Sequence, residues 1–182
     1  MLHNASNVGD VIQIRLILQH AGTGVNSKDP SGATPLMYAS QPGHMSAIRM
    51  LLEALAAVDV KDNSGATALM HASAGGHDGA MRMLLEAGAA VEAFNGATAL
   101  MSASTSGHKR AVRLLLEAGA VVDTKGTHER TALMLASVNG HEGVMRMLLE
   151  AGAAVDLKDD FGKTALMLAS VQKHLSAVRV LL

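Results

Sequence analysis

No cysteine or tryptophan occurs in this sequence, and aromatic residues make up only 2% of its 182 residues. Without cysteine, the chain has no disulfide framework, no thiolate metal site and no cysteine nucleophile. With so few aromatic rings, the core must be built from Ala, Leu, Met and Val, although 49% of all residues are hydrophobic. An excess of one charge is also absent, because 15 Lys and Arg residues are balanced by 16 Asp and Glu residues. Near-neutrality argues against a general nucleic-acid partner.

Hydrophobic runs long enough to span a bilayer are missing as well, since charged residues interrupt the apolar stretches. We therefore expect no membrane insertion. The N-terminal residues lack a basic segment followed by an apolar stretch, so no signal peptide is predicted. Together with the absence of cysteine, these features suit a reducing compartment, and we expect an intracellular, cytoplasmic protein. The length fits one domain over residues 1–182, with enough chain to bury a substantial core.

A seven-residue segment recurs along the chain at a nearly fixed spacing. It first appears complete as Thr-Pro-Leu-Met-Tyr-Ala-Ser, and later copies begin with Thr-Ala-Leu-Met. A Gly-His pair and a block close to Leu-Leu-Glu-Ala-Gly-Ala follow most copies, and a sixth, N-terminal copy begins at Leu2. The copies begin at Thr34, Thr67, Thr98, Thr131 and Thr164. We predict six repeats, at approximately 1–27, 28–60, 61–93, 94–124, 125–157 and 158–182, with the first and last incomplete.

Each copy has the pattern of helix, turn, helix and loop. The leading threonine is a good N-cap, and Pro35 stands at the first helical position, where proline is tolerated. The glycine before histidine supplies a left-handed residue that ends the first helix. The second helix carries apolar residues at helical spacing, such as Ile48, Leu51 and Leu52, and a Gly-Ala pair ends it. One copy cannot bury both helices alone, so each must stack on its neighbours.

These motifs resemble those of ankyrin repeats, and the resemblance covers about residues 2–182. It implies an all-α solenoid with β-hairpin-like loops, which recognises proteins on a concave face formed by hairpin tips and inner helices. The chain departs from the family where His usually follows Thr-Pro-Leu, because Met stands there in five copies. The Thr–His hydrogen bond of the family is then missing, and a flexible thioether fills the gap.

Two irregularities fall in the middle of the array. The fourth copy is two residues shorter than its neighbours, and in the fifth copy Glu129 occupies the position of a hairpin glycine. Because glutamate is poor at a positive φ, we expect a turn of different shape there. The irregular hairpins either form a specific pocket or are tolerated drift.

Histidine and arginine each recur once per repeat, and both rows have structural explanations. Successive histidines would lie on stacked elements roughly 8–10 Å apart, too far to share one metal ion, so they are interpreted as turn-stabilising residues. The arginines are followed by glutamate four residues later in four copies, which predicts a solvated outer face of offsetting charges. No catalytic constellation or phosphate-binding loop is present, and we expect neither an enzyme nor a cofactor or metal site.

The candidate functional residues lie at positions that vary between repeats, on the inner helices and hairpins. Arg130 and Lys163 occupy one hairpin position where earlier copies have alanine, so a ligand with an apolar segment followed by acidic residues is expected. The predicted partner-binding residues are Tyr38, His71, Phe94, His128, Arg130, Phe161 and Lys163.

The sequence thus predicts a non-enzymatic protein–protein interaction module with a protein or peptide partner. We expect a monomer unless its C-terminal end pairs, since the final repeat ends inside a helix at Leu182 without a polar cap. The alternative is a structural spacer, a fragment of a larger receptor, channel or ligase whose activity lies elsewhere.

Overall fold

The structure is a computed structural model that describes residues 1–19, 24–93 and 96–182. Over these residues it contains α-helices, one short 3-10 helix and no β-strand, so the predicted all-α fold is confirmed. The α-helices are α1 (Leu2–Val8), α2 (Val11–Gln19), α3 (Pro35–Ser40), α4 (Met45–Glu53), α5 (Ala68–Gly75), α6 (Asp78–Glu86), α7 (Ala99–Ser106), α8 (Lys109–Glu117), α9 (Ala132–Val138), α10 (Glu142–Glu150), α11 (Ala165–Val171) and α12 (Leu175–Leu181).

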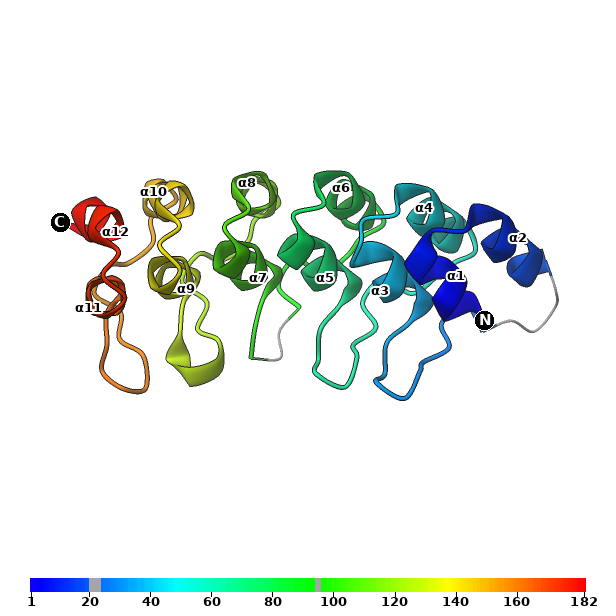
Figure 1. The fold of residues 1–182 in the computed structure, drawn as a ribbon, viewed down its shortest axis with the longest axis horizontal. Coiled ribbons are helices and arrows are strands. Elements are labelled where there is room, and N and C mark those ends of the chain that lie inside the picture. The colour runs from blue at the N-terminus through cyan, green and yellow to red at the C-terminus, as the bar shows by residue number, and fades with distance from the viewer. Residues whose placement is uncertain (20–23, 94–95) are drawn as a thin grey trace.

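The helices form two parallel rows, and each helix pair stacks on the next (Figure 1). One row holds the inner helices α1, α3, α5, α7, α9 and α11. The other holds the outer helices α2, α4, α6, α8, α10 and α12. The long loops project from the side of the inner helices (Figure 1). The array is therefore a solenoid in which each pair contacts only its neighbours.

The inner helices begin as the sequence predicts. In five of them the hydroxyl of the leading threonine accepts a hydrogen bond from the methionine amide three residues later, as in Thr67 and Met70. At Thr34 the thioether of Met37 also accepts from the threonine amide, at 3.4 Å. Methionine thus takes over a capping contact there, and it is buried in four of these helices, at Met37, Met70, Met101 and Met134.

The core lies between the two rows and runs the length of the solenoid. Outer helices contribute fully buried side chains at helical spacing, among them Ile48, Leu51, Leu84 and Leu115. Inner helices contribute small alanines, such as Ala72, which let the helices pack closely. An aliphatic and methionine core without aromatic rings is what the composition requires.

The repeated histidines connect neighbouring repeats. Each ring Nε2 lies 2.9–3.0 Å from a backbone carbonyl oxygen near the end of the preceding inner helix, so the Nε2-protonated ring donates a hydrogen bond. The pairs are His44–Asn7, His77–Gln41, His108–Ala74, His141–Thr105 and His174–Val138. Their role is structural, as expected, but it joins two repeats rather than stabilising a single turn.

A second set of hydrogen bonds joins the loops that follow the outer helices. Asn26, Asp59, Glu92 and Asp123 each accept from a backbone amide 29 or 31 residues further along the chain. These polar side chains thus satisfy backbone donors of the next repeat.

The projecting loops are hairpin-like without forming strands. Four of them close with a backbone hydrogen bond over four residues, at Asp29–Ala33, Asp62–Ala66, Gly126–Arg130 and Asp159–Lys163. Neighbouring loops also bond to one another, for example from the amide of Asn63 to the carbonyl of Ser31. Similar bonds run from Thr127 to Gly96 and from Asp160 to His128, so several neighbouring loops are joined through their backbones.

The irregular turn at Glu129 has the expected difference in shape. His128 and Glu129 have φ values of 59° and 56°, and the loop contains a 3-10 helix (η1, Thr127–Glu129). Two consecutive side chains are thus held in the left-handed region, which costs backbone energy. The shortened hairpin of the fourth repeat includes Phe94 and Asn95, which lie outside the described residues.

Candidate protein-binding groove

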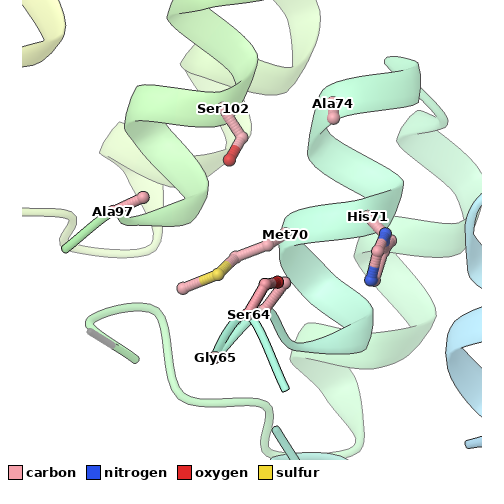
Figure 2. A pocket seen from close by; sticks show the side chains of 8 residues that line it. Ser64, Gly65, Met70, His71, Ala74, Ala97 and Ser102 are labelled. Atoms are coloured by element: carbon pink, nitrogen blue, oxygen red, sulfur yellow. The ribbon is translucent and has the colours of Figure 1, made fainter. Parts of the chain in front are cut away.

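A hollow of about 210 Å³ lies between α5 and α7, on the side where the hairpins project (Figure 2). Small residues from the hairpins and both inner helices make this space, and Met70 and His71 line its side toward α5 (Figure 2). The lining residues are Ser64, Gly65, Ala66, Met70, His71, Ala74, Ala97 and Ser102.

A second hollow of about 140 Å³ lies one repeat earlier, between α3 and α5. Tyr38 and Gln41 line it from α3, and Asp62 and His71 line it from the next repeat. His71 therefore borders both hollows. We call the two hollows together the inner groove.

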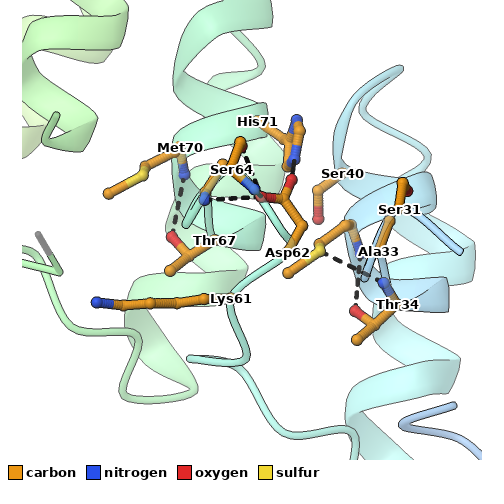
Figure 3. Close-up of polar contacts among 12 residues, drawn as sticks. Ser31, Ala33, Thr34, Ser40, Lys61, Asp62, Ser64, Thr67, Met70 and His71 are labelled. Atoms are coloured by element: carbon orange, nitrogen blue, oxygen red, sulfur yellow. Dashed lines mark hydrogen bonds and ion pairs between the residues drawn. The ribbon is translucent and has the colours of Figure 1, made fainter. Parts of the chain in front are cut away.

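His71 is held in place by the hairpin that precedes its own helix. Its Nε2 lies 3.2 Å from Oδ2 of Asp62, and the other carboxylate oxygen of Asp62 accepts hydrogen bonds from the backbone of Ser64 and Ala66 and from the Ser64 hydroxyl (Figure 3). Burial raises the pKa of Asp62, but these hydrogen bonds outweigh burial and leave the pKa below its ordinary value. The carboxylate is therefore a charged anchor that fixes both hairpin and ring.

Tyr38 is held by the equivalent aspartate of the preceding repeat. Its hydroxyl donates to Oδ2 of Asp29 at 2.7 Å, and the ring packs edge-on against His3, with centroids 5.6 Å apart. Hydrogen bonds from Ser31 and Tyr38 lower the pKa of Asp29 to about 2. The Tyr38 hydroxyl is thus already hydrogen-bonded within the protein, and the ring is the part of the side chain that remains for the predicted partner contact.

The hydrogen bond between Tyr38 and Asp29 makes the stability of the fold depend on pH in the acidic range. The pKa of Asp29 is about 2 in the folded protein against an ordinary 3.8, so the associated stability is present above pH 3.8 and is lost as the pH falls toward 2. Tyr38→Phe removes one of the hydrogen bonds that lower the pKa, and we expect the loss of melting temperature between about pH 4 and pH 2 to become shallower. Melting curves across that range measure it. In an Asp29→Asn background Tyr38→Phe should leave the pH dependence unchanged, and a change there would contradict the assignment.

The C-terminal candidates gather in two neighbouring hairpins. The rings of His128 and Phe161 lie 5.8 Å apart, and Phe161 is 65% exposed. His128 Nδ1 also lies 3.7 Å from a carboxylate oxygen of Asp160. These residues form an exposed aromatic cluster at the hairpin tips.

Arg130 faces an acidic group of its own chain. Its Nε lies 3.5 Å from Oδ2 of the buried Asp159. Burial raises the pKa of Asp159, but the backbone amides of Lys163 and Phe161 and the side chain of Arg130 together lower it below the ordinary value. The positive charge predicted for this end is therefore partly neutralised, while Lys163 is exposed.

The structure divides the predicted site residues into two groups. Tyr38 and His71 line the inner groove, whereas His128, Arg130, Phe161 and Lys163 lie in the C-terminal hairpins, and Phe94 falls outside the described residues.

Sequence reasoning missed the hairpin aspartates that organise both groups. Their signal was available, because Asp29, Asp62 and Asp159 precede the variable hairpin residue by four positions and the variable inner-helix position by nine.

Within the described residues, no cluster of three or more His, Asp or Glu side chains could hold a metal ion. No helix in that part of the chain is long and apolar enough to cross a membrane.

Stacked helix pairs, with a row of projecting hairpins and the inner groove beside the inner helices, define an α-helical repeat protein of the solenoid class. The chain belongs to the ankyrin repeat family: the family model described as ankyrin repeats in three copies matches residues 2–95, 56–126, 90–159 and 122–182. Domains of this family are generally protein–protein interaction modules without enzymatic activity.

Solved structures and a curated relative agree with this assignment. The human ASB11 ankyrin repeat domain is 27% identical with a TM-score of 0.90, over 99% of this chain and 81% of that one. A chain from the complex of the predatory endopeptidase Bd0816 of Bdellovibrio bacteriovorus with the immunity protein Bd3460 is 27% identical with a TM-score of 0.89, over 99% and 95%. Human ankyrin repeat and SAM domain-containing protein 3 is 40% identical over 53 residues, which span 29% of this chain and 8% of the relative's length.

Proposed function

We propose that this chain is a non-enzymatic module that binds a segment of a partner protein in the inner groove and along the hairpin tips. The hollow between α5 and α7 carries the proposal, because its small side chains leave room for a partner's side chain beside the fixed His71 ring. A second hollow one repeat away suits a segment that presents two side chains in succession. The similarity to a chain from a protein–protein complex supports a protein as the ligand.

The proposed binding surface, from the inner groove to the C-terminal hairpin tips, differs in chemistry between its two ends. Toward the N-terminus it presents alanines, the ring of Tyr38 and the His71–Asp62 pair. Toward the C-terminus, leucine fills the inner-helix position of Tyr38, and Leu168 is only 6% exposed, so contacts there move out to the hairpins. Phe161 and His128 would supply an aromatic surface and Lys163 a positive charge.

The proposed contacts are those predicted from the sequence, Tyr38, His71, Phe94, His128, Arg130, Phe161 and Lys163. The preferred ligand would carry an apolar segment for the hollows followed by acidic residues near Lys163 and Arg130. We further propose that the module works as a monomer in the cytoplasm, in keeping with the absence of cysteine.

Peptide selection from an unbiased displayed library tests the proposal, because this chain supplies its own groove-filling substitutions. Leucine occupies the position of Ser102 in α9 and α11, and Arg130 occupies the position of Ala97. Ser102→Leu and Ala97→Arg should therefore fold while filling the hollow. We expect selected peptides to lose about tenfold or more in affinity for these variants, which corresponds to one displaced side chain.

The matched control is Arg49→Gln on the exposed surface of α4, which should leave peptide binding unchanged. Binding that survives both groove-filling variants would remove the inner groove from the proposal. Selected peptides rich in lysine and arginine would contradict the predicted polarity of the ligand. A library that returns no binder would favour the alternative function, a spacer within a larger protein.

A further inference from the structure

The outer helices carry a hollow that the proposed groove does not use. It has a volume of about 310 Å³ and lies between α6 and α8, which neighbour each other in the outer row (Figure 1). Three arginines from the two helices line it, together with two acidic residues and the apolar Leu114. The residues are Asp78, Arg82, Arg110, Arg113, Leu114 and Glu117.

The three arginines are available for an external ligand. All are exposed, and across the described residues none lies within 4 Å of a carboxylate oxygen. Helical spacing predicts that pairs such as Arg82–Glu86 and Arg113–Glu117 offset these charges, but no such Arg–Glu pair forms within the described residues. An exposed ion pair contributes little free energy compared with the conformational entropy lost when two long side chains are held together. The three guanidinium groups therefore stay exposed to solvent.

Helix α8 also differs from its neighbours in charge. It begins with Lys109 and Arg110, whereas α6 begins with Asp78 and Gly79, and α10 begins with an acid and Gly143. A β-carbon on Gly143 would overlap the side chain of Lys109, so the absence of a side chain there gives Lys109 its space on α10. Positively charged side chains thus extend from α6 across α8 to α10.

We propose that the hollow between α6 and α8 is a docking site for an acidic segment of a partner protein, distinct from the inner groove. Guanidinium groups present a planar fork of donors that matches a carboxylate in two-point contact. The three arginines come from two helices, so an acidic protein segment, which presents several carboxylates in succession, would contact more of them than a single carboxylate does. Three guanidinium groups against two carboxylates leave too little surplus charge to follow a nucleic-acid backbone.

The carboxylates at the site make the proposal testable in both directions. Asp78 and Glu117 would repel an acidic ligand, so removing one charge should strengthen binding, while removing an arginine should weaken it. Serine occupies the position of Arg110 in α4 and α12, so Arg110→Ser is compatible with this helix. We expect Arg110→Ser to weaken binding about threefold and Glu117→Gln to strengthen it about twofold, as for exposed charged contacts.

The probe is a polyglutamate peptide of about ten residues, titrated into the whole chain at about 50 mM salt. The arginine side-chain Nε–H signals are followed by NMR, with a polylysine peptide of equal length as the negative ligand. The largest shifts should fall on Arg82, Arg110 and Arg113, and they should diminish at about 200 mM salt. Arg49→Gln, on the neighbouring helix α4 but outside the lining of this hollow, should not change the affinity.

Three other results would each contradict the proposal. Equal shifts at Arg49 and Arg146 would indicate a diffuse charge effect, and an absence of shifts would exclude an acidic ligand. Full displacement of the peptide by inorganic phosphate at matched ionic strength would indicate a site for a small anion rather than a protein segment. Circular dichroism of Arg110→Ser and Glu117→Gln verifies that both variants fold, and the readout is independent of the inner groove.

Discussion

Gly76→Ala is expected to lower the melting temperature far more than Gly88→Ala does. Both glycines have positive φ, 66° and 87°, so alanine costs about 1–2 kcal/mol of backbone strain at either position. A β-carbon at Gly88 meets no atom within 4 Å, whereas at Gly76 it would lie 2.6 Å from the ring of His108. Overpacking adds about 1–3 kcal/mol, so we expect a loss of about 3 kcal/mol and about 6–12 °C at Gly76.

The comparison is completed by removing the ring. In a His108→Ala background the clash is gone, and Gly76→Ala should cost only what Gly88→Ala costs. Thermal and urea unfolding of the four variants give the coupling between the two positions. An equal cost of Gly76→Ala with and without the ring would show that the histidine contact does not constrain the glycine.

Leu115→Ala is expected to be the most damaging single truncation on α8. The side chain is fully buried between the two helical rows, and truncation of such a leucine costs about 2–5 kcal/mol because the surroundings collapse only partly into the cavity. Leu116, the next residue, is only partly buried, and its truncation should cost about 1 kcal/mol. Urea denaturation of the two variants measures both losses of unfolding free energy.

The outcome also tests how the solenoid distributes its stability. Since each repeat contacts only its neighbours, a cavity on α8 weakens one local interface in the middle of the array. A broadened transition for Leu115→Ala, with unfolding detected first near α8 by hydrogen exchange, would show that cooperativity is local. Equal losses for Leu115→Ala and Leu116→Ala would contradict the burial on which the prediction depends.

The helical elements could be predicted because each rests on local chemistry. Threonine caps a helix through its own neighbours, and a left-handed glycine ends one, so Thr67 and Gly76 mark the bounds of α5 without knowledge of the fold. The period then dictates stacking, because a single pair of helices leaves an apolar face uncovered. The unusual hairpin at Glu129 was predictable for the same reason, since it depends on one residue's φ.

The candidate site was only partly predictable, because it depends on contacts between residues far apart in sequence. Tyr38 and His71 were recognised as variable positions, but their bonds to Asp29 and Asp62 depend on how each hairpin folds back on its helix. The expected Arg–Glu pairs illustrate the opposite error. Sequence spacing placed each pair one helical turn apart, yet the exposed side chains do not meet.

The family, the all-α class and the register of the repeats can be read from the amino-acid sequence, because these follow from short-range periodicity and capping. The positions of the hollows and of the unpaired charges depend on how the repeats stack in three dimensions. Both depend on which side chains two neighbouring repeats bring to the same hollow. Ser102 and His71 line one hollow of the inner groove, and Arg110 and Arg82 line the hollow between the outer helices. A repeat pattern specifies what is common to all copies, whereas recognition depends on where adjacent copies differ once they are stacked.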